Sequence, residues 1–178
     1  MTRRNQRNHG SLMLLLGCAA TWVTGMQTRE SLAETPSVRA RYTKYEYRVP
    51  MRDGVKLFTS VYVPKDASEP YPFLLRRSPY SCKPYGVDQY PDRLGPSDEL
   101  CESGYIFVFQ DVRGRWMSEG ELVNMRPHIP AKRGPKDVDE SSDTFDTIEW
   151  LLKNIPNNNG RVGQWGVSYP GFYTSCGM

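Results

Sequence analysis

The pattern of apolar and polar positions changes character along the chain. Residues 42–49 and 55–63 are rich in aromatic and β-branched side chains, a composition typical of strands. Residues 51–54 (MRDG) lie between them, and an Asp-Gly pair favours a tight turn between antiparallel strands. The pattern therefore predicts a β-hairpin, which follows a polar linker at residues 34–41.

Two later runs are apolar without alternation, at residues 73–75 (FLL) and 105–109 (YIFVF). Strands that are buried on both faces have this pattern, which is typical of a parallel sheet covered by helices. Between the two runs, residues 92–103 leave room for a short helix.

The strongest helical pattern lies between residues 139 and 155. Acidic side chains gather at its start, where they complement the helix dipole, and residues 156–160 (PNNNG) end it. The apolar positions at helical spacing, which we expect to face the core, are Phe145, Ile148, Leu151, Leu152 and Ile155. Residues 161–167 then predict another buried strand, so that strand, helix and strand form a right-handed βαβ unit.

Residues 111–136 are dense in glycine, proline and charge, and they have no regular period. A long segment of this kind is either part of an active-site surface or a disordered insertion.

Positive charge is concentrated at the N-terminus. Residues 1–33 hold four arginines and one glutamate, and the rest of the chain holds 19 basic and 19 acidic residues. Without a basic field on the remaining chain, the electrostatic attraction that drives nucleic-acid binding is missing. We therefore exclude nucleic acid as a partner.

The arginines precede an apolar stretch at residues 12–26 and a small-x-small sequence at residues 31–33 (SLA). This order predicts an export signal over residues 1–33 and a secreted or periplasmic protein. The stretch is shorter than the roughly 20 residues that span a bilayer, so it predicts no transmembrane helix. Residues 15–18 (LLGC) also resemble a lipoprotein cleavage box, which leaves a lipid anchor at Cys18 open.

The remaining cysteines do not form a disulfide scaffold or a metal site. In an exported protein Cys82 and Cys101 could pair, and buried thiols without a bond are the alternative. No cysteine or histidine spacing typical of zinc occurs, and His128 is the one histidine outside the predicted signal. The sequence therefore predicts no metal and no cofactor.

Residues 166–171 (GVSYPG) are the turn that carries candidate chemistry. A nucleophilic serine at a strand-to-helix corner needs small neighbours because the turn is sharp, and the corner exposes its Oγ. The backbone N–H of Tyr169 then points towards a developing oxyanion. An ordinary loop serine is the alternative for Ser168, but its position after a predicted βαβ unit strengthens the catalytic interpretation.

Four motifs, in order, resemble the peptidase S15 family of cocaine esterase and X-prolyl dipeptidyl-peptidase-like hydrolases. They are residues 51–55 (MRDGV), 77–80 (RSPY), 111–120 (DVRG and SEG) and 166–171 (GVSYPG). Within that family the chain is most similar to α-amino acid ester hydrolases and glutaryl-7-aminocephalosporanic acid acylases. The resemblance implies an α/β-hydrolase fold, a mostly parallel sheet with flanking helices, of which residues 34–178 are the N-terminal part.

The resemblance also implies that Ser168 is the acylated nucleophile and that the Tyr80 O–H and the Tyr169 N–H bind the oxyanion. A phenol stays protonated at neutral pH and can donate. The loop after the third strand is also where such folds place their second oxyanion donor. A tyrosine that only packs under a turn is the alternative for Tyr80.

Three further residues have less specific interpretations. We expect Asp111 and Arg113 to fix loops, with Asp111 near the carboxyl edge of the sheet and Arg113 bridging carbonyls. Trp116 either lines the acyl pocket or packs on a neighbouring loop.

No His, Asp or Glu follows Ser168, so the nucleophile, acid and histidine order of α/β-hydrolases is not completed. His128 precedes the turn and is a poor substitute. We therefore expect a catalytic domain cut just after its nucleophile, inactive by itself, with sheet residues such as Phe107 and Val167 left partly exposed. A non-catalytic remnant or a binding protein is the alternative.

For the whole protein we expect a small ester, amide or peptide substrate, and a homo-oligomer is left open. Pro170 stands where the ester hydrolases usually carry Glu. Acylase, esterase and X-prolyl peptidase activities therefore remain alternatives.

Overall fold

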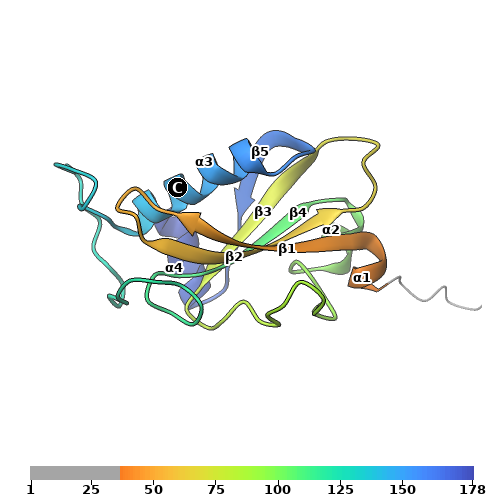
Figure 1. The fold of residues 1–178 in the computed structure, drawn as a ribbon, viewed down its shortest axis with the longest axis horizontal. Helices are drawn as coiled ribbons and strands as arrows, with labels where there is room; N and C mark the ends of the chain where they lie inside the picture. Colours follow the sequence, from red (N-terminus) through yellow and green to blue (C-terminus); the bar gives the residue numbers. More distant parts are fainter. Residues whose placement is uncertain (1–36) are drawn as a thin grey trace, which may run out of the picture. The chain divides into compact units, whose positions relative to one another are not determined.

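The computed structural model describes residues 37–178, which belong to one compact unit. Its elements in chain order are α1 (Val38–Arg41), β1 (Tyr42–Pro50), β2 (Lys56–Pro64), β3 (Tyr71–Ser78), α2 (Asp98–Glu102), β4 (Ile106–Asp111), α3 (Glu140–Asn154), β5 (Asn158–Gln164) and α4 (Tyr169–Cys176) (Figure 1). The predicted export signal and Cys18 lie outside the described residues and stay predictions. Within residues 37–178, no helix is both long and apolar enough to cross a membrane.

The five strands form one mixed sheet in the order β1-β2-β4-β3-β5. β1 and β2 form the predicted hairpin, and β2 also pairs antiparallel with β4. β3 is parallel to both β4 and β5. The carboxyl ends of these three parallel strands therefore meet at one edge of the sheet, where α/β proteins place their sites.

Both faces of the central strands are covered, as their unbroken apolar runs predict. Phe73 and Leu75 of β3 face α3 together with Ile106 and Val108 of β4. The alternate positions, including Leu74 and Phe107, face the opposite side, where α1, α2 and the segment between β3 and α2 pack. Phe107 is fully buried, but the other sheet residues expected to be left partly exposed are half-buried or exposed: Phe109, Val162, Trp165 and Val167.

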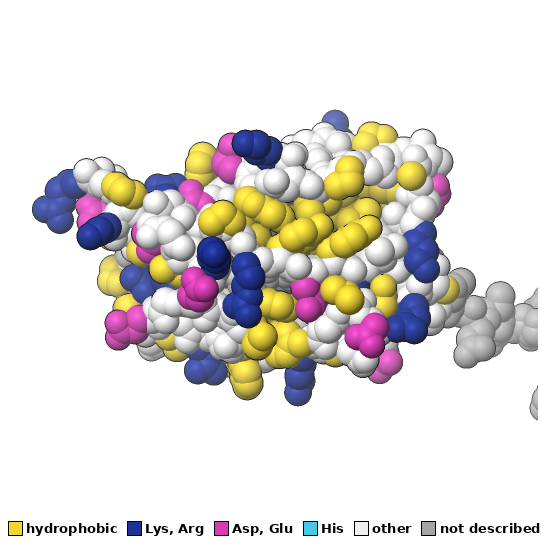
Figure 2. Space-filling model, viewed as in Figure 1, with side chains coloured by type: hydrophobic (Ala, Val, Ile, Leu, Met, Phe, Trp, Pro, Cys, Tyr) yellow, Lys and Arg dark blue, Asp and Glu magenta, His cyan; other side chains and the backbone are white. Residues whose placement is uncertain are grey.

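The face that α3 covers is closed only in part. Figure 2 shows apolar side chains gathered in a shallow hollow on this side of the molecule. The half-buried apolar residues that border the core here are Tyr47, Val63, Ile148, Trp150, Leu152 and Val162.

Helix α3 begins and ends close to the predicted positions. Asp139 caps it, because its side chain accepts from the Ser142 N–H while the Ser142 hydroxyl accepts from the Asp139 N–H. Leu151 and Ile155 are buried as expected, but Phe145 is 57% exposed and lies beneath the Arg52 guanidinium. Its exposure places Phe145 on the outer side of α3 despite its helical spacing, so its assignment to the core is wrong.

The strand before the serine turn differs from its prediction. It covers Asn158–Gln164 instead of residues 161–167, and most of its positions are exposed or half-buried. In the described part of the chain, β3 is its one pairing partner, so β5 is an edge strand. Val167 lies beyond the strand and is 78% exposed.

Two other predicted boundaries are corrected. The expected polar linker at residues 34–41 contains the helical turn α1, and Val38 is buried in the core. The short helix expected within residues 92–103 is confined to α2.

The irregular segment after β4 is pinned to the hairpin and is not a detached insertion. The Ser118 hydroxyl donates to the Asp111 carbonyl at 2.6 Å and accepts from the Phe58 N–H of β2 at 2.8 Å. Gly114 (φ +69°) permits this turn, because a Cβ there would lie 2.1 Å from the Leu122 nitrogen. The segment is therefore part of the surface at the carboxyl edge of the sheet.

Buried ion pairs connect this segment to the rest of the fold. Asp143 of α3 contacts Arg113 at 2.6 Å and Arg77 of β3 at 3.7 Å, and all three side chains are at most 5% exposed. Arg113 also contacts Asp53 of the hairpin turn at 2.7 Å. Arg113 therefore bridges two carboxylates, and the expectation that it bridges carbonyls is wrong.

The pair network gives the first prediction. Asp143→Asn in the whole protein should lower the free energy of unfolding by about 3–5 kcal/mol, because two buried guanidinium groups lose their shared carboxylate. The matched control is Asp98→Ala, which removes a pair to Arg93 whose two side chains are more than half exposed and should cost less than ~1 kcal/mol. Denaturant unfolding followed by circular dichroism measures both values. Equal losses for the two variants would contradict a structural role for the network.

Candidate active site

Ser168 occupies a strained corner between β5 and α4. Its backbone has φ +60° and ψ −127°, a combination that L-residues rarely adopt, and its side chain is exposed. Such strain persists only where the surrounding structure imposes it, and it is concentrated at functional sites. The geometry is the one that the GVSYPG sequence predicts for a serine presented at a sharp turn.

Gly166 shows what imposes this corner. A Cβ at Gly166 would lie 2.3 Å from the carbonyl carbon and oxygen of Pro170 and 2.6 Å from the Gly171 nitrogen. The start of α4 therefore passes directly against the beginning of the turn, and only glycine fits at this position. A Cβ at Gly171 would in turn approach the Gly166 oxygen to 3.2 Å.

The first turn of α4 leaves one backbone donor free. The Ser168 carbonyl accepts from the Gly171 N–H at 2.9 Å and from the Phe172 N–H at 3.2 Å. Pro170 has no N–H. The Tyr169 N–H has no acceptor among residues 37–178, and at a helix N-terminus it can bind a negatively charged oxygen.

Tyr80 lies beside this corner although 88 positions separate it from Ser168. It follows β3, whose parallel neighbour β5 leads into the serine turn, so both loops leave the same edge of the sheet. The Tyr80 ring lies 6.2 Å from the Tyr169 ring, nearly perpendicular to it. Tyr80 is 58% exposed, and its hydroxyl has no partner in the described part of the chain, which disfavours burial under a turn.

Asp111 has the loop-fixing role that the sequence indicates. The carboxylate is fully buried at the end of β4. It accepts from the Cys82 N–H at 2.8 Å, the Tyr85 hydroxyl at 2.9 Å and the Met117 N–H at 3.2 Å. It therefore joins the loop that follows β3 to the loop that follows β4. Burial, and then the charge of Asp111, raises the pKa of the Cys82 thiol well above its usual range.

Arg113 is equally committed to structure. Burial alone would raise the pKa of Asp53, but the hydrogen bonds and charge of Arg113 outweigh burial and hold that pKa below its ordinary value. No part of either side chain is left to bind a substrate.

Trp116 packs on a neighbouring loop, which is one of the two interpretations of its sequence position. Its indole N–H donates to the Pro79 carbonyl at 2.9 Å, so it is packed on the loop that carries Tyr80. The ring is nevertheless 59% exposed, and its backbone is in the left-handed region at φ +49°. It offers an apolar surface next to Tyr80.

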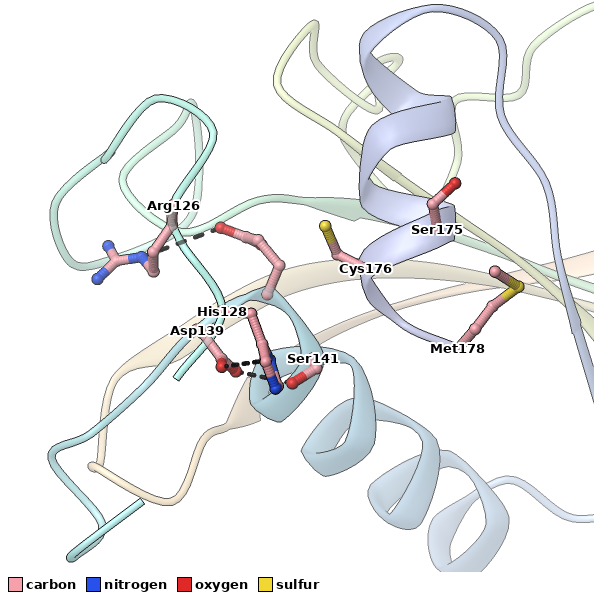
Figure 3. Close-up of a pocket in the computed structure, with 8 residues that line it drawn as sticks. Arg126, His128, Asp139, Ser141, Ser175, Cys176 and Met178 are labelled. Atoms are coloured by element: carbon pink, nitrogen blue, oxygen red, sulfur yellow. Dashed lines mark hydrogen bonds and ion pairs between the residues drawn. The ribbon is translucent and has the colours of Figure 1, made fainter. Parts of the chain in front are cut away.

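His128 does not join Ser168. Its Nδ1 lies 3.1 Å from an oxygen of Asp139, the N-cap of α3. Both residues line a cavity of about 370 Å³ between the start of α3 and the end of α4, and Ser168 is not among its lining residues (Figure 3). Burial would raise the pKa of Asp139, but backbone and lysine hydrogen bonds hold it far below its usual range.

The cysteines of the described residues are free thiols. Cys82 lies under Asp111, and Cys101 lies in α2 with the opposite-face core. The pairing of Cys82 with Cys101 is therefore not formed, and buried thiols, the alternative, are observed.

One contact at the site has no signal in the sequence. The Tyr169 phenol oxygen accepts from the Met125 N–H at 3.1 Å, and the hydroxyl donates to the Asn124 side-chain oxygen. Residues 124 and 125 lie in the irregular segment, more than 40 positions from Tyr169. Only the folded chain brings them together.

Comparisons with known proteins agree with this architecture. The chain is 41% identical over 123 residues to the cocaine esterase of Rhodococcus sp. (strain MB1 Bresler), covering 69% of this chain and 19% of that protein. It superposes on an aminopeptidase from a marine sediment archaeon of the Thaumarchaeota with a TM-score of 0.67 at 38% identity, covering 80% of this chain and 24% of that one. An α-amino acid ester hydrolase gives the same TM-score at 37% identity, covering 86% and 26%.

The chain thus spans about a fifth to a quarter of the length of these relatives. Residues 53–177, more than half of the chain, match the family model of the S15 X-Pro dipeptidyl-peptidases. The matched range contains Asp53 and Gly54 of the hairpin turn, Tyr80 and the strained serine corner. The chain belongs to the X-Pro dipeptidyl-peptidase (S15) family.

Proposed function

We propose that the whole protein is a serine hydrolase that cleaves an ester or amide through an acyl-enzyme on Ser168. The observation that carries the proposal is the backbone of Ser168, held at φ +60° and ψ −127° by the close approach of Gly166 to the start of α4. This backbone conformation is energetically unfavourable, and such strain is concentrated at functional sites, which favours a functional serine over an ordinary loop serine. The names of the relatives, an esterase, an aminopeptidase and an ester hydrolase, share the cleavage of an acyl–oxygen or acyl–nitrogen bond.

In this proposal Ser168 Oγ attacks the substrate carbonyl carbon. A bond forms between Oγ and that carbon, the carbonyl π electrons move to its oxygen, and the Oγ proton passes to a base. The tetrahedral oxyanion accepts hydrogen bonds from the Tyr169 N–H and the Tyr80 hydroxyl, the two donors left free at the corner. Collapse then expels the alcohol or amine, which takes up the proton, and water later releases the acyl group.

The base belongs to the whole protein. Among residues 37–178, no histidine or carboxylate makes a hydrogen bond to Ser168, and His128 is held by Asp139. Because the matched part of this chain covers only 19% to 26% of these relatives, we assign the acid and the histidine to the rest of the hydrolase.

The assignment of the nucleophile predicts covalent labelling. A fluorophosphonate probe should label the whole protein at Ser168, and Ser168→Ala should abolish the label, as peptide mass spectrometry can show. Ser175→Ala is the matched control, because Ser175 is another exposed serine of α4. Labelling that survives Ser168→Ala would rule out this nucleophile.

The oxyanion role of Tyr80 predicts a loss of rate. Tyr80→Phe should lower kcat by roughly 10²-fold, because one preorganised donor is removed, and should leave KM nearly unchanged. Steady-state kinetics with a p-nitrophenyl ester measures both constants. Tyr45→Phe, which changes an exposed tyrosine of β1, is the control and should behave as wild type. A normal kcat for Tyr80→Phe would leave Tyr80 with a packing role.

The strained corner predicts a steric limit at Gly166. Gly166→Ala should lower stability by about 1–3 kcal/mol or more, because the added methyl group overlaps the backbone of α4. It should also reduce the rate of fluorophosphonate labelling. Gly134→Ala, where nothing lies within 4 Å of the added Cβ, should leave both unchanged. Thermal melts and labelling time courses compare the two, and a Gly166→Ala protein as stable as Gly134→Ala would contradict the close approach.

A further inference from the structure

The side chain of Tyr169 occupies a fixed position next to the serine corner. Its ring stacks on Tyr173, with ring centres 5.2 Å apart and planes 18° from parallel, and Tyr173 is 1% exposed. Phe172 and Tyr80 flank the same ring at 5.8 and 6.2 Å. Packing against a buried partner restricts the ring, so the phenol oxygen is a fixed point on the surface.

The Tyr169 phenol makes two hydrogen bonds, one donated and one accepted, and both join it to the same short segment. It donates to the Asn124 side chain and accepts from the Met125 backbone N–H. An oxygen engaged in this way is not free to bind an oxyanion, so the contribution of the Tyr169 side chain must be indirect. Residues 124 and 125 are therefore held at the tip of the Tyr169 side chain, and Tyr169 directly follows Ser168.

A second anchor holds the same segment further along. The Ile129 N–H donates to Asp139 at 2.9 Å, and the Lys132 ammonium group donates to the same carboxylate at 2.8 Å. Residues 124–132 therefore run from the first residue of α4 to the N-cap of α3. Of the two anchors, the one at Tyr169 borders the serine corner.

The anchored segment presents an apolar side chain instead of burying it. Met125 has a left-handed backbone at φ +47° and is 56% exposed, because its N–H is turned towards the phenol. Trp116, earlier in the irregular segment, also has a left-handed backbone and an exposed ring, and its indole N–H donates to the Pro79 carbonyl. Tyr80 is the third exposed apolar residue that contacts this corner.

We propose that the Tyr169 phenol is a positioning group that holds Met125 beside Ser168, and that Met125, Trp116 and Tyr80 together bind an apolar, preferably aromatic, acyl group. This inference rests on the proposed function and adds its substrate class. Exposed apolar side chains gathered at one place mark a binding surface, and all three are uncharged. The arginines that are neighbours of Trp116 and Met125 in sequence have partners within the protein, since Arg115 donates to the Pro79 carbonyl at 3.1 Å and Arg126 to the Glu121 carbonyl at 3.1 Å.

The test compares kcat/KM of the whole protein for p-nitrophenyl phenylacetate and p-nitrophenyl acetate. Tyr169→Phe keeps the ring and the backbone N–H but loses the anchor, so it should lower the phenylacetate-to-acetate ratio roughly 5- to 10-fold, mainly through KM for phenylacetate. Asn124→Ala should shift the ratio in the same direction, and Asn124→Asp, which keeps the acceptor oxygen, should restore it.

Met125→Ala should lower the same ratio roughly tenfold, because it removes apolar contact with the larger acyl group only. Met125 is exposed, so this variant tests the proposal even if Tyr169→Phe folds poorly. Val123→Ala is the matched control, because Val123 is a partly exposed apolar residue of the same loop that precedes the two residues bonded to the Tyr169 phenol, and it should keep the wild-type ratio.

Two outcomes would overturn the inference. If Tyr169→Phe and Met125→Ala leave the ratio unchanged, or if they slow both esters equally, the segment does not select the acyl group. Neither result touches the proposed function while Ser168→Ala still abolishes hydrolysis of both esters. Hydrolysis that survives Ser168→Ala would instead remove the proposed function, and the inference with it.

Discussion

The Asp143 carboxylate pairs with two arginines that come from different segments of the chain. The geometry at the carboxyl edge of the sheet depends on this shared carboxylate. Arg77 comes from β3, Arg113 from the loop after β4, and Arg113 carries the connection on to Asp53 in the hairpin turn. Removing such charges from water is costly, so each must be matched by partners within the protein. The Arg77 guanidinium also pairs with the Glu140 carboxylate at 3.2 Å, and it donates to Gln110, to the Glu140 carbonyl and to Thr144.

This network places the site without contributing to its chemistry. Arg77 fixes the end of β3 three residues before Tyr80, and the same helix α3 that supplies Asp143 also supplies the cap that anchors residues 124–132. Asp111 acts similarly one strand away, where it binds the loops that carry Cys82 and Met117. The loops that carry the exposed groups at the serine corner are therefore fixed by hydrogen bonds and ion pairs within the protein. A surface of this kind can be preorganised without any ligand.

Local signals in the sequence predicted much of this arrangement. The Asp-Gly hairpin, the two apolar runs, the acidic start of α3 and the glycine-flanked serine each act within a few residues, and each appears where it was expected. Predictions of burial were wrong where contacts between distant segments determine which residues are covered. Phe145 has core spacing but lies on the outer side of α3, and residues 161–167 were expected to be buried although β5 is an edge strand. The pairing of Arg113 with Asp53 and Asp143 joins three distant segments, and no spacing rule encodes it.

The contact between Tyr169 and residues 124–125 is the sharpest case of this limit. The sequence accounts for the backbone of Tyr169, because its N–H follows from the position after Ser168 at a helix start. The destination of its phenol depends on how the irregular segment crosses the edge of the sheet, and that path is set by Asp139 and by the loop contacts of Ser118. The position of the Tyr169 backbone thus follows from the local sequence, whereas the contacts of its side chain follow only from the fold. In the proposed mechanism its backbone N–H binds the oxyanion formed at Ser168, and in the further inference its side chain positions the surface that binds the acyl group.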